Sequence, residues 1–384
     1  MDKVTKDTIQ NIHNADTQMV ISVTGAGSKA ITWLLSIPGA SKTLLEAYVP
    51  YSESSQKKFL DASNLSKSVS EDTATALAKK SYRNAVQLRQ FDYPVIGVGC
   101  TAAISTDRNR RGANEAFISI WNPGGINTIH ITLDKSEEDR AKDEEKISLL
   151  ILSQIAKMVL GKSEIEIPLN AKDTIEESTQ EFKSIIDSLI AGQIKSFIKR
   201  STTTKNIPDG KYSGVILSGS FNPLHQGHVA LKKYVAQKYD LDFTYEISIS
   251  NVDKPNLTSK EIKLRLGQFK KEDTVIIDQA PLFSEKSILF PKSIFLIGYD
   301  TAERLVDIKY YSSDFEQMCQ SLSLIEHNKC RFLIAGRVTN GKFLTLENLN
   351  IPKRFKDLFI EIPESEFRVD KSSSEIRNRT PNGF

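Results

Sequence analysis

Cysteine is scarce in this sequence, and its scarcity excludes several ways of stabilising a fold. The 384 residues include three cysteines, Cys100, Cys319 and Cys330, with no close pairing and no CxxC motif. This number and spacing exclude a disulfide framework and a zinc site built from thiols. We therefore expect a protein of a reducing compartment whose cysteines are buried or inert.

Long apolar runs and an excess of one charge are also lacking. No stretch approaches the roughly 18 apolar residues that a membrane-spanning helix needs, and residues 1–7 are polar, without the apolar region of a signal peptide. The 51 basic and 48 acidic residues give a formal charge of +3. That balance indicates neither a nucleic acid nor a membrane surface as partner. We expect a cytoplasmic location, with the nucleus as the alternative.

The length predicts two domains, because 384 residues exceed what one ordinary hydrophobic core supports. Strand patterns at 19–23, 45–49, 95–99, 116–121 and 127–133 alternate with helix patterns at 30–37, 71–90 and 137–160, which is typical of α/β domains. Residues 164–210 are largely polar and charged, with an amphipathic helix predicted over 178–199. We predict an α/β domain over 1–163, a helical and polar linker over 164–210, and a second α/β domain over 211–384.

One stretch of the second domain, residues 219–228, carries the clearest chemistry. Its sequence is GSFNPLHQGH, and it lies between an apolar run at 214–217 and a helical pattern at 229–235. We interpret it as the end of a buried strand, a glycine-containing turn and the start of a helix. Gly219 and Gly227 would let a phosphate approach backbone N–H groups beside a helix N-terminus. The stretch therefore predicts an anion-binding site.

The two histidines of this stretch make the prediction more specific. His225 and His228 lie three residues apart, so near a first helical turn their rings point to one side. His-x-Gly-His is expected by chance roughly 0.003 times per chain of this composition. Residues 218–228 resemble the signature of the HxGH nucleotidylyltransferase superfamily, and the Gly-Ser-Phe-Asn-Pro run most resembles nicotinamide or nicotinate mononucleotide adenylyltransferases. The resemblance implies a Rossmann-like parallel sheet, catalytic His225 and His228, Mg²⁺ bound with ATP, and no metal ligands from the protein.

Other residues of the second half resemble the same superfamily. Residues 371–377, KSSSEIR, are similar to its Ile-Ser-Ser-Thr-x-Ile-Arg element, with Lys371 in place of the isoleucine. Asp300 follows a predicted buried strand at 293–297, and a helix N-cap is an alternative role for it. For Lys254 and Arg265 the alternative is a solvated surface position, and for Tyr310 it is packing. The resemblance assigns nucleotide and phosphate binding to Gly219, Ser220, Phe221, Lys254, Ser373, Ser374 and Arg377, and mononucleotide binding to Asp300, Tyr310 and Arg337.

The first half resembles the C-terminal domain of the competence-damage protein CinA, a family that includes nicotinamide mononucleotide amidases. Residues 22–25, SVTG, are similar to the family's Ser-Cys-Thr-Gly, and residues 51–52 to its Tyr-Ser element. The resemblance implies a degenerate amidase site at Ser22, Thr24 and Tyr51, with Ser22 as the expected nucleophile. The family's lysine five residues after the tyrosine is Gln56 here. A serine nucleophile needs a base within hydrogen-bond reach, and the sequence nominates none, so a nonhydrolytic ligand-binding or scaffold role is the favoured reading and an active amidase the alternative.

Together these observations predict a nucleotidylyltransferase that uses ATP and a small phosphorylated substrate. The expected reaction is adenylyl transfer to nicotinamide or nicotinate mononucleotide, which gives a dinucleotide and pyrophosphate. The alternatives are a cytidylyltransferase or another HxGH transferase, and a noncatalytic nucleotide-binding regulator. The sequence leaves a homo-oligomer open.

Overall fold

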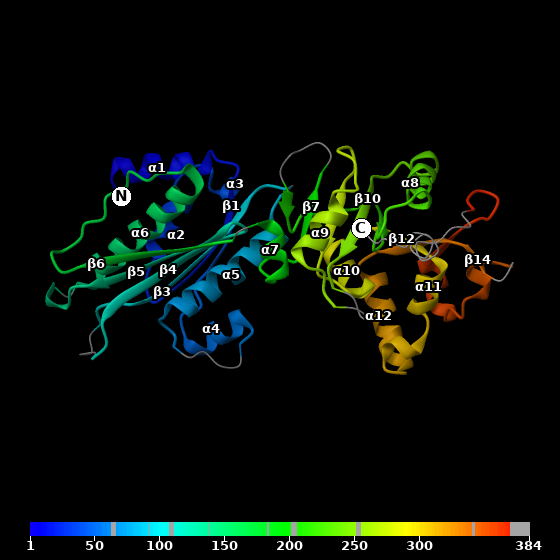
Figure 1. Ribbon diagram of the computed structural model, residues 1–384. Coiled ribbons are helices and arrows are strands. Elements are labelled where there is room, and N and C mark those ends of the chain that lie inside the picture. The colour runs from blue at the N-terminus through cyan, green and yellow to red at the C-terminus, as the bar shows by residue number, and fades with distance from the viewer. Residues whose placement is uncertain are drawn as a thin grey trace. The chain divides into compact units, whose positions relative to one another are not determined.

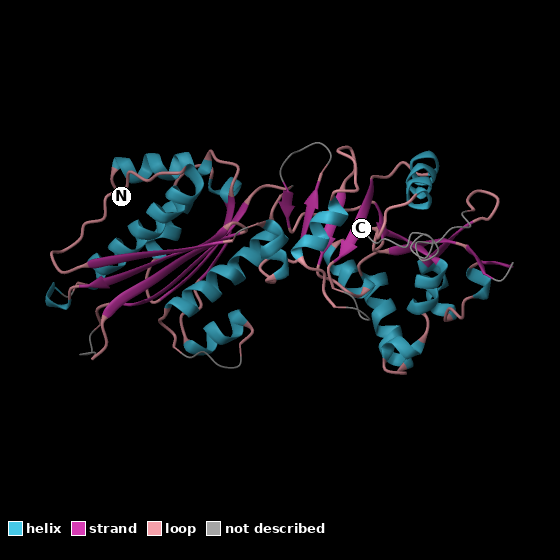
Figure 2. Ribbon diagram, in the orientation of Figure 1, coloured by secondary structure: helices cyan, strands magenta, loops and turns pink. Residues whose placement is uncertain are grey.

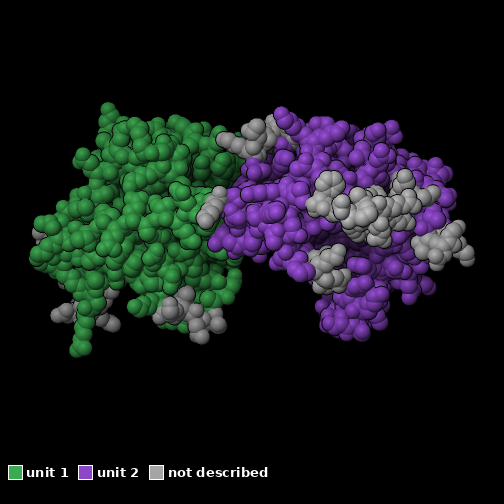
Figure 3. Space-filling model, in the orientation of Figure 1, with its two compact units in different colours: residues 1–183 green, residues 184–384 purple. Residues whose placement is uncertain are grey.

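The computed structural model describes residues 1–62, 67–90, 92–106, 111–137, 139–182, 184–200, 206–250, 255–339 and 342–368. The chain divides into two compact units, residues 1–183 and 184–384 (Figure 3). Each unit combines helices with a sheet that contains parallel strands, which confirms the predicted α/β class. Within these ranges, no helix combines the length and the apolar character that crossing a membrane requires.

The first unit is built on a mixed sheet. Its described strands are β1 (Gln18–Thr24), β2 (Leu44–Tyr48), β3 (Val95–Ala103), β4 (Asn114–Asn122), β5 (Gly125–Leu133) and β6 (Thr174–Glu181). They lie in the order β2-β1-β3-β4-β5-β6, in which β2, β1 and β3 are parallel and the pairs from β3 to β6 are antiparallel. β1 is buried along its whole length, as expected for an apolar central strand.

Helices cover both faces of this sheet (Figure 2). They are α1 (Lys3–His13), α2 (Ser28–Ser36), α3 (Ala40–Thr43), α4 (Glu53–Leu60), α5 (Glu71–Leu88) and α6 (Arg140–Leu160), with a 3₁₀ turn, η1 (Lys135–Glu137). Figure 1 shows α1, α2 and α6 on one face and α4 and α5 on the other. α5 lies against β3 because Gly97 and Gly99 have no side chains: a Cβ there would come within 2.0 Å of the Ala78 carbonyl oxygen and 2.2 Å of the Ala74 carbonyl oxygen.

Parts of the region predicted as a linker are strands of the two sheets. β6 pairs antiparallel with β5 of the first unit, and β7 (Ser196–Lys199) pairs antiparallel with a strand of the second. The amphipathic helix predicted over 178–199 is wrong. That segment holds the end of β6, the short helix α7 (Ile185–Ile190) and β7, because strand pairing with each sheet outweighs the helical spacing of its apolar residues.

The second unit is a largely parallel sheet. Its remaining described strands are β8 (Asn206–Pro208), β9 (Val215–Ser218), β10 (Phe243–Ser248), β11 (Val275–Asp278), β12 (Ile294–Gly298), β13 (Arg331–Ala335) and β16 (Phe359–Ile362), with a separate hairpin of β14 (Arg337–Thr339) and β15 (Lys342–Leu344). The sheet order is β16-β13-β12-β9-β10-β11-β7-β8, and the six strands from β16 to β11 are parallel. Numbered along the chain, those six follow the 3-2-1-4-5-6 order of a doubly wound dinucleotide-binding sheet.

This strand order places a topological switch point between β9 and β12. The chain leaves β9 toward β10 on one side and returns to β12 on the other, so the loops after the two strands diverge at one sheet edge. Ligands of open α/β sheets bind in the crevice at such an edge. The histidine stretch follows β9, and Asp300 follows β12.

Helices and 3₁₀ turns fill the connections of the second unit. They are α8 (Gln226–Lys238), α9 (Ser259–Leu266), α10 (Phe283–Leu289), α11 (Tyr299–Leu305), α12 (Phe315–His327), η2 (Ile308–Tyr311), η3 (Leu346–Asn348) and η4 (Lys353–Leu358). On one face of the sheet, Phe295 and Phe332 of the central strands pack with Met318 and Leu322 of α12 in a single buried core. This core makes β12 and β13 a rigid support for the residues at their carboxyl ends.

Candidate active site

The two histidines form the first turn of α8, as the sequence predicts. His225 is the N-cap residue, and its Nδ1 accepts a hydrogen bond from the Gly227 N–H at 3.2 Å. The His225 N–H in turn donates to Nδ1 of His228 at 3.2 Å. The rings stack with centroids 3.7 Å apart and an angle of 24° between their planes. A reciprocal capping box, made here by two imidazoles, therefore fixes both rings against the helix start.

Burial keeps both imidazoles neutral at physiological pH. It lowers the pKa of His225 below its ordinary value, and burial together with the neighbouring His225 lowers the pKa of His228 to about 3. Because Nδ1 of each ring accepts a hydrogen bond, the single proton of each neutral ring is on Nε2. The site thus holds two N–H donors at a helix N-terminus without adding a full positive charge.

The glycines of the loop have a different role from the one predicted. The Gly227 N–H, expected to be left for a phosphate, is used by His225 Nδ1. A Cβ on Gly219 would lie 2.9 Å from the ring of Phe221, which is itself 1% exposed. That ring meets His228 edge to face, with centroids 4.8 Å apart. Gly219 therefore makes room for the aromatic ring that packs against the second histidine.

Gln268, which the sequence did not place in the site, and Arg265, a loosely matched candidate, hold this loop from outside. Gln268 donates from Nε2 to the Phe221 carbonyl oxygen at 2.9 Å and accepts at Oε1 from the Leu224 N–H at 2.8 Å. Arg265 of α9 donates from its guanidinium to the Ser220 carbonyl oxygen at 3.0 Å. Arg265 was expected only loosely, as a phosphate-facing or surface residue. A glutamine that binds backbone 44 residues away leaves no local pattern.

The second group of predicted residues meets at the carboxyl ends of β12 and β13. Asp300 lies in the first turn of α11, whose N-cap is Gly298, so the alternative role of Asp300 as the cap is wrong. Its carboxylate forms an ion pair with Arg337, which follows β13. The Tyr310 ring contacts the cations of Arg304 and Lys309, at 5.6 Å and 5.0 Å from its centroid. The structure thus brings Asp300 and Arg337 together and places Tyr310 in a separate cation–π cluster.

Four predicted residues, Lys254, Ser373, Ser374 and Arg377, lie outside the described residues. The chain that leads to the last three is anchored to the histidine helix: Glu366 accepts from Tyr234 Oη at 2.7 Å and from Lys238 Nζ at 2.8 Å, both on α8.

A buried charged cluster under the same sheet edge was not predicted. Lys286 of α10 donates to Glu246 of β10 at 2.7 Å, and Asp278 at the end of β11 lies beside them. Burial and the neighbouring Glu246 raise the pKa of Asp278 well above its ordinary value. Glu246 Oε1 and Asp278 Oδ2 have no hydrogen-bond partner while both groups are ionised. A proton on Asp278 satisfies both atoms and leaves a neutral cluster.

In the first unit, Ser22 and Thr24 of the expected amidase site are buried, and Tyr51 is exposed. Ser22 is 0% exposed, and its hydroxyl makes a 2.6 Å hydrogen bond with the hydroxyl of Ser81 on α5. Thr24 is buried and accepts from Gln56 Nε2 at 3.0 Å. Tyr51 is exposed, and its hydroxyl accepts from Arg140 at 3.5 Å. Among the described residues, Ser22 has no imidazole, carboxylate or amine base within hydrogen-bond reach.

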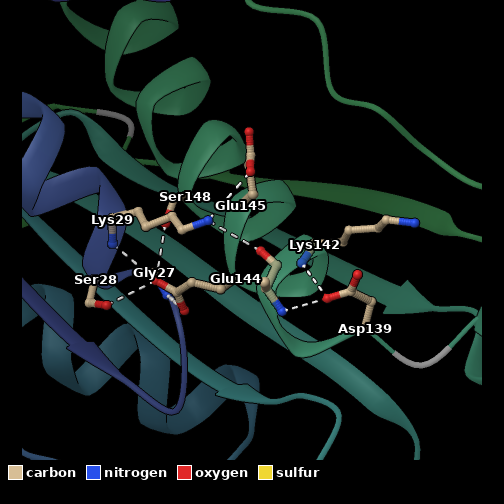
Figure 4. Close-up of polar contacts among 9 residues, drawn as sticks. Gly27, Ser28, Lys29, Asp139, Lys142, Glu144, Glu145 and Ser148 are labelled. Atoms are coloured by element: carbon tan, nitrogen blue, oxygen red, sulfur yellow. Dashed lines mark hydrogen bonds and ion pairs between the residues drawn. The ribbon is translucent and has the colours of Figure 1, made fainter. Parts of the chain in front are cut away.

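The glycine turn of the first unit is filled by the chain's own carboxylate (Figure 4). Glu144 of α6 accepts from the backbone N–H groups of Gly27 and Lys29, at 2.9 Å and 3.0 Å, and from the Ser28 hydroxyl at 3.0 Å. These are the groups that a helix N-terminus offers to an anion. At the start of α2, the Glu144 carboxylate therefore accepts the hydrogen bonds that a bound phosphate or carboxylate would accept.

The fold and the site define the class of the second unit. A parallel sheet in doubly wound order, with a His-x-Gly-His helix start at its switch point, is a Rossmann-like nucleotidylyltransferase fold. Residues 216–379 match the cytidylyltransferase-like family. Over these residues the C-terminal unit is similar to a family of nucleotidyltransferases.

Individual proteins resemble each part of the chain. Over 183 residues the chain is 27% identical to a probable nicotinate-nucleotide adenylyltransferase of Fusobacterium nucleatum, which covers 44% of this chain and 86% of that protein. Among solved structures, a competence-damaged protein (CinA) superfamily protein from Escherichia coli is 15% identical, with a TM-score of 0.32 over 40% of this chain and 86% of that one. The competence/damage inducible protein CihA from Agrobacterium tumefaciens is 17% identical, with a TM-score of 0.32 over 42% and 96%.

Proposed function

We propose that this chain transfers the adenylyl group of ATP to nicotinate or nicotinamide mononucleotide, giving a dinucleotide and pyrophosphate. The observation that carries nucleotidyl transfer is the pair of neutral, Nδ1-anchored imidazoles stacked at the start of α8. The choice of substrate is supported by the resemblance to a probable nicotinate-nucleotide adenylyltransferase.

The chemistry needs no covalent enzyme intermediate. A phosphate oxygen of the mononucleotide attacks the α-phosphorus of ATP in line, the bond from that phosphorus to the bridging oxygen breaks, and pyrophosphate leaves with the electron pair. Catalysis then depends on positioning and on charge stabilisation. The Nε2–H donors of His225 and His228 would serve phosphoryl oxygens, and both rings would do so in their neutral state.

We propose that Mg²⁺ enters with ATP and is held by its phosphates. Within the described ranges, no three or more histidine, cysteine, aspartate or glutamate side chains are grouped to hold a metal ion. Bound in this way, Mg²⁺ would neutralise charge on the leaving pyrophosphate. Lys254, Ser373, Ser374 and Arg377 would contribute on the protein side.

The mononucleotide would lie toward the carboxyl ends of β12 and β13. There Arg337 and Asp300 form an ion pair that is partly exposed on both sides, with side-chain exposures of 40% and 57%. A ribose hydroxyl can bind Asp300 and a phosphate can bind Arg337 without either charge first leaving a buried site.

Pyrophosphate release by the full chain tests the proposal. Mg-ATP or Mg-CTP is supplied with nicotinate mononucleotide, nicotinamide mononucleotide, phosphocholine, phosphoethanolamine or phosphopantetheine. We expect release with ATP and a pyridine mononucleotide, at a rate that His228→Ala lowers at least about a hundredfold. His327→Ala, an exposed histidine at the end of α12, is the matched control and should retain the wild-type rate.

Other outcomes change the proposal in defined ways. Release only with CTP, or only with a non-pyridine phosphate, would keep the reaction type and overturn the substrate. ATP binding without pyrophosphate release in the presence of any of the five acceptors would support a noncatalytic nucleotide-binding regulator instead.

A further inference from the structure

We infer that Gln268 is a positioning residue of the transfer reaction, which fixes the direction of the His228 ring through the backbone of the preceding loop. The inference rests on the proposed function for its effect on rate. Its structural basis is the double hydrogen bond that Gln268 makes across residues 221–224.

The Gln268 amide holds both ends of the segment before the histidines. Nε2 donates to the carbonyl oxygen of Phe221, and Oε1 accepts from the N–H of Leu224. Phe221 has a φ of 42°, in the left-handed region that disfavours a residue with a Cβ. A backbone of this kind persists where its surroundings restrain it. Gln268 supplies that restraint on the carbonyl side of Phe221.

The second hydrogen bond acts one residue further along. By binding the Leu224 N–H, Gln268 fixes the direction in which the chain enters His225. The N–H of His225 is the group that donates to Nδ1 of His228. That hydrogen bond leaves the ring proton on Nε2 and sets the plane in which Nε2–H points. A continuous chain of contacts thus joins the amide of Gln268 to the donor of the second histidine.

Gln268 lies outside α9, in the turn that follows its last residue, Leu266. The same turn region is tied to the loop a second time, because Arg265 donates to the Ser220 carbonyl oxygen. Gln268 itself is half-buried, and its other hydrogen bond goes to the Arg265 carbonyl oxygen at 3.4 Å. The loop is therefore supported from the end of one helix along the whole stretch before His225.

Substitution of Gln268 by methionine tests the inference with the full chain. Gln268→Met keeps the length of the side chain and removes both the donor and the acceptor. Gln268→Glu keeps an acceptor for Leu224 and loses the donor to Phe221. Gln279→Met is the matched control, because Gln279 is also half-buried and also donates to a backbone carbonyl, that of Leu189, away from the histidine loop.

Two readouts separate positioning from simple stability. The first is steady-state pyrophosphate release: we expect Gln268→Met to lower kcat by roughly tenfold to a hundredfold, with KM for ATP changed by less than about threefold, since misplaced groups cost rate more than binding. The second is the ¹⁵N spectrum of the histidine rings in the unliganded chain. His228 should show a single Nε2–H tautomer in wild type, Gln268→Glu and Gln279→Met, and averaged ring signals in Gln268→Met.

The outcomes are distinguishable from failure of the proposed function. A wild-type chain without transferase activity would overturn that function, while the ring spectra still decide the role of Gln268. An unchanged His228 tautomer in folded Gln268→Met would overturn the inference whatever the rate. Averaged signals in Gln268→Glu would contradict the route through Leu224, and a wild-type kcat in Gln268→Met would show that the loop holds its geometry without this residue.

Discussion

Replacing Gly219 by alanine should destabilise the second unit, because the new methyl group collides with Phe221. The added Cβ would lie 2.9, 3.1 and 3.3 Å from three ring atoms, whereas carbon atoms in contact are separated by about 3.5–4.0 Å. The ring cannot easily withdraw, since Tyr245 and Phe269 pack edge to face against it, each with a centroid 5.4 Å away. Either the ring or the backbone at Gly219 must shift.

The size of the effect follows from the cost of overpacking a buried site. Forcing one extra methyl group into a packed core costs roughly 1–3 kcal/mol. In a unit of 201 residues, 184–384, each kcal/mol lowers Tm by about 2–4 °C. We therefore expect Gly219→Ala to lower Tm of the second unit by roughly 2–12 °C. The displaced ring should also disturb His228, which it contacts, and so lower kcat.

Thermal unfolding followed by circular dichroism, with pyrophosphate release measured in parallel, tests this expectation. The matched control is Gly267→Ala, where the nearest atom would be 3.4 Å away at the helix end, an ordinary contact, so that Tm should change by less than about 2 °C. If Gly219→Ala keeps the wild-type Tm and only raises KM for ATP, the glycine serves phosphate approach, and our account of Phe221 is wrong.

Three further predictions concern titratable and buried polar groups. Burial depresses the pKa of His228 from 6.5 to about 3, so the stability that its neutral ring supports is complete above pH 6.5 and is lost as pH falls toward 3. The free energy of unfolding in urea should therefore differ less between pH 5 and pH 7.5 in His228→Asn than in wild type. Asp278→Asn replaces a protonated acid by a neutral amide and should change the free energy of unfolding by less than about 1 kcal/mol, whereas Glu246→Gln leaves a buried lysine unpaired and should cost about 3–5 kcal/mol; equal costs in urea titrations would contradict a proton on Asp278. Ser22→Ala should cost about 1–3 kcal/mol by leaving the Ser81 hydroxyl without a partner, with no change in pyrophosphate release, and a loss of nicotinamide mononucleotide hydrolysis in this variant would restore the amidase interpretation.

The sequence predicted the features that local patterns of residues indicate. The α/β class follows from alternating strand and helix periodicities, and His225 and His228 follow from a rare spacing that implies its own geometry on a helix start. Asp300 was placed at a strand end because an apolar strand pattern precedes it. In each case the signal lies within ten or so residues of the feature that it predicts.

The rest depended on contacts between distant segments, which no local pattern records. Residues 178–199 were predicted as one amphipathic helix from their apolar spacing, but pairing with β5 and β11 makes the two ends of that segment strands. Gln268 binds backbone 44 residues before it, and Glu144 caps a helix 117 residues before it. The sequence assigned Gly219 to phosphate approach, whereas its contact with the Phe221 ring appears only when the loop closes on itself.

The most direct test of the account is ³¹P NMR of the reaction products. The full chain is incubated with Mg-ATP and nicotinate or nicotinamide mononucleotide, and the spectrum is followed over time. We predict equal amounts of inorganic pyrophosphate and of a dinucleotide whose two phosphorus atoms share a bridging oxygen, with both absent in His228→Ala. ATP that stays intact, or that yields only ADP or AMP while the mononucleotide signal persists, would contradict adenylyl transfer to a pyridine mononucleotide.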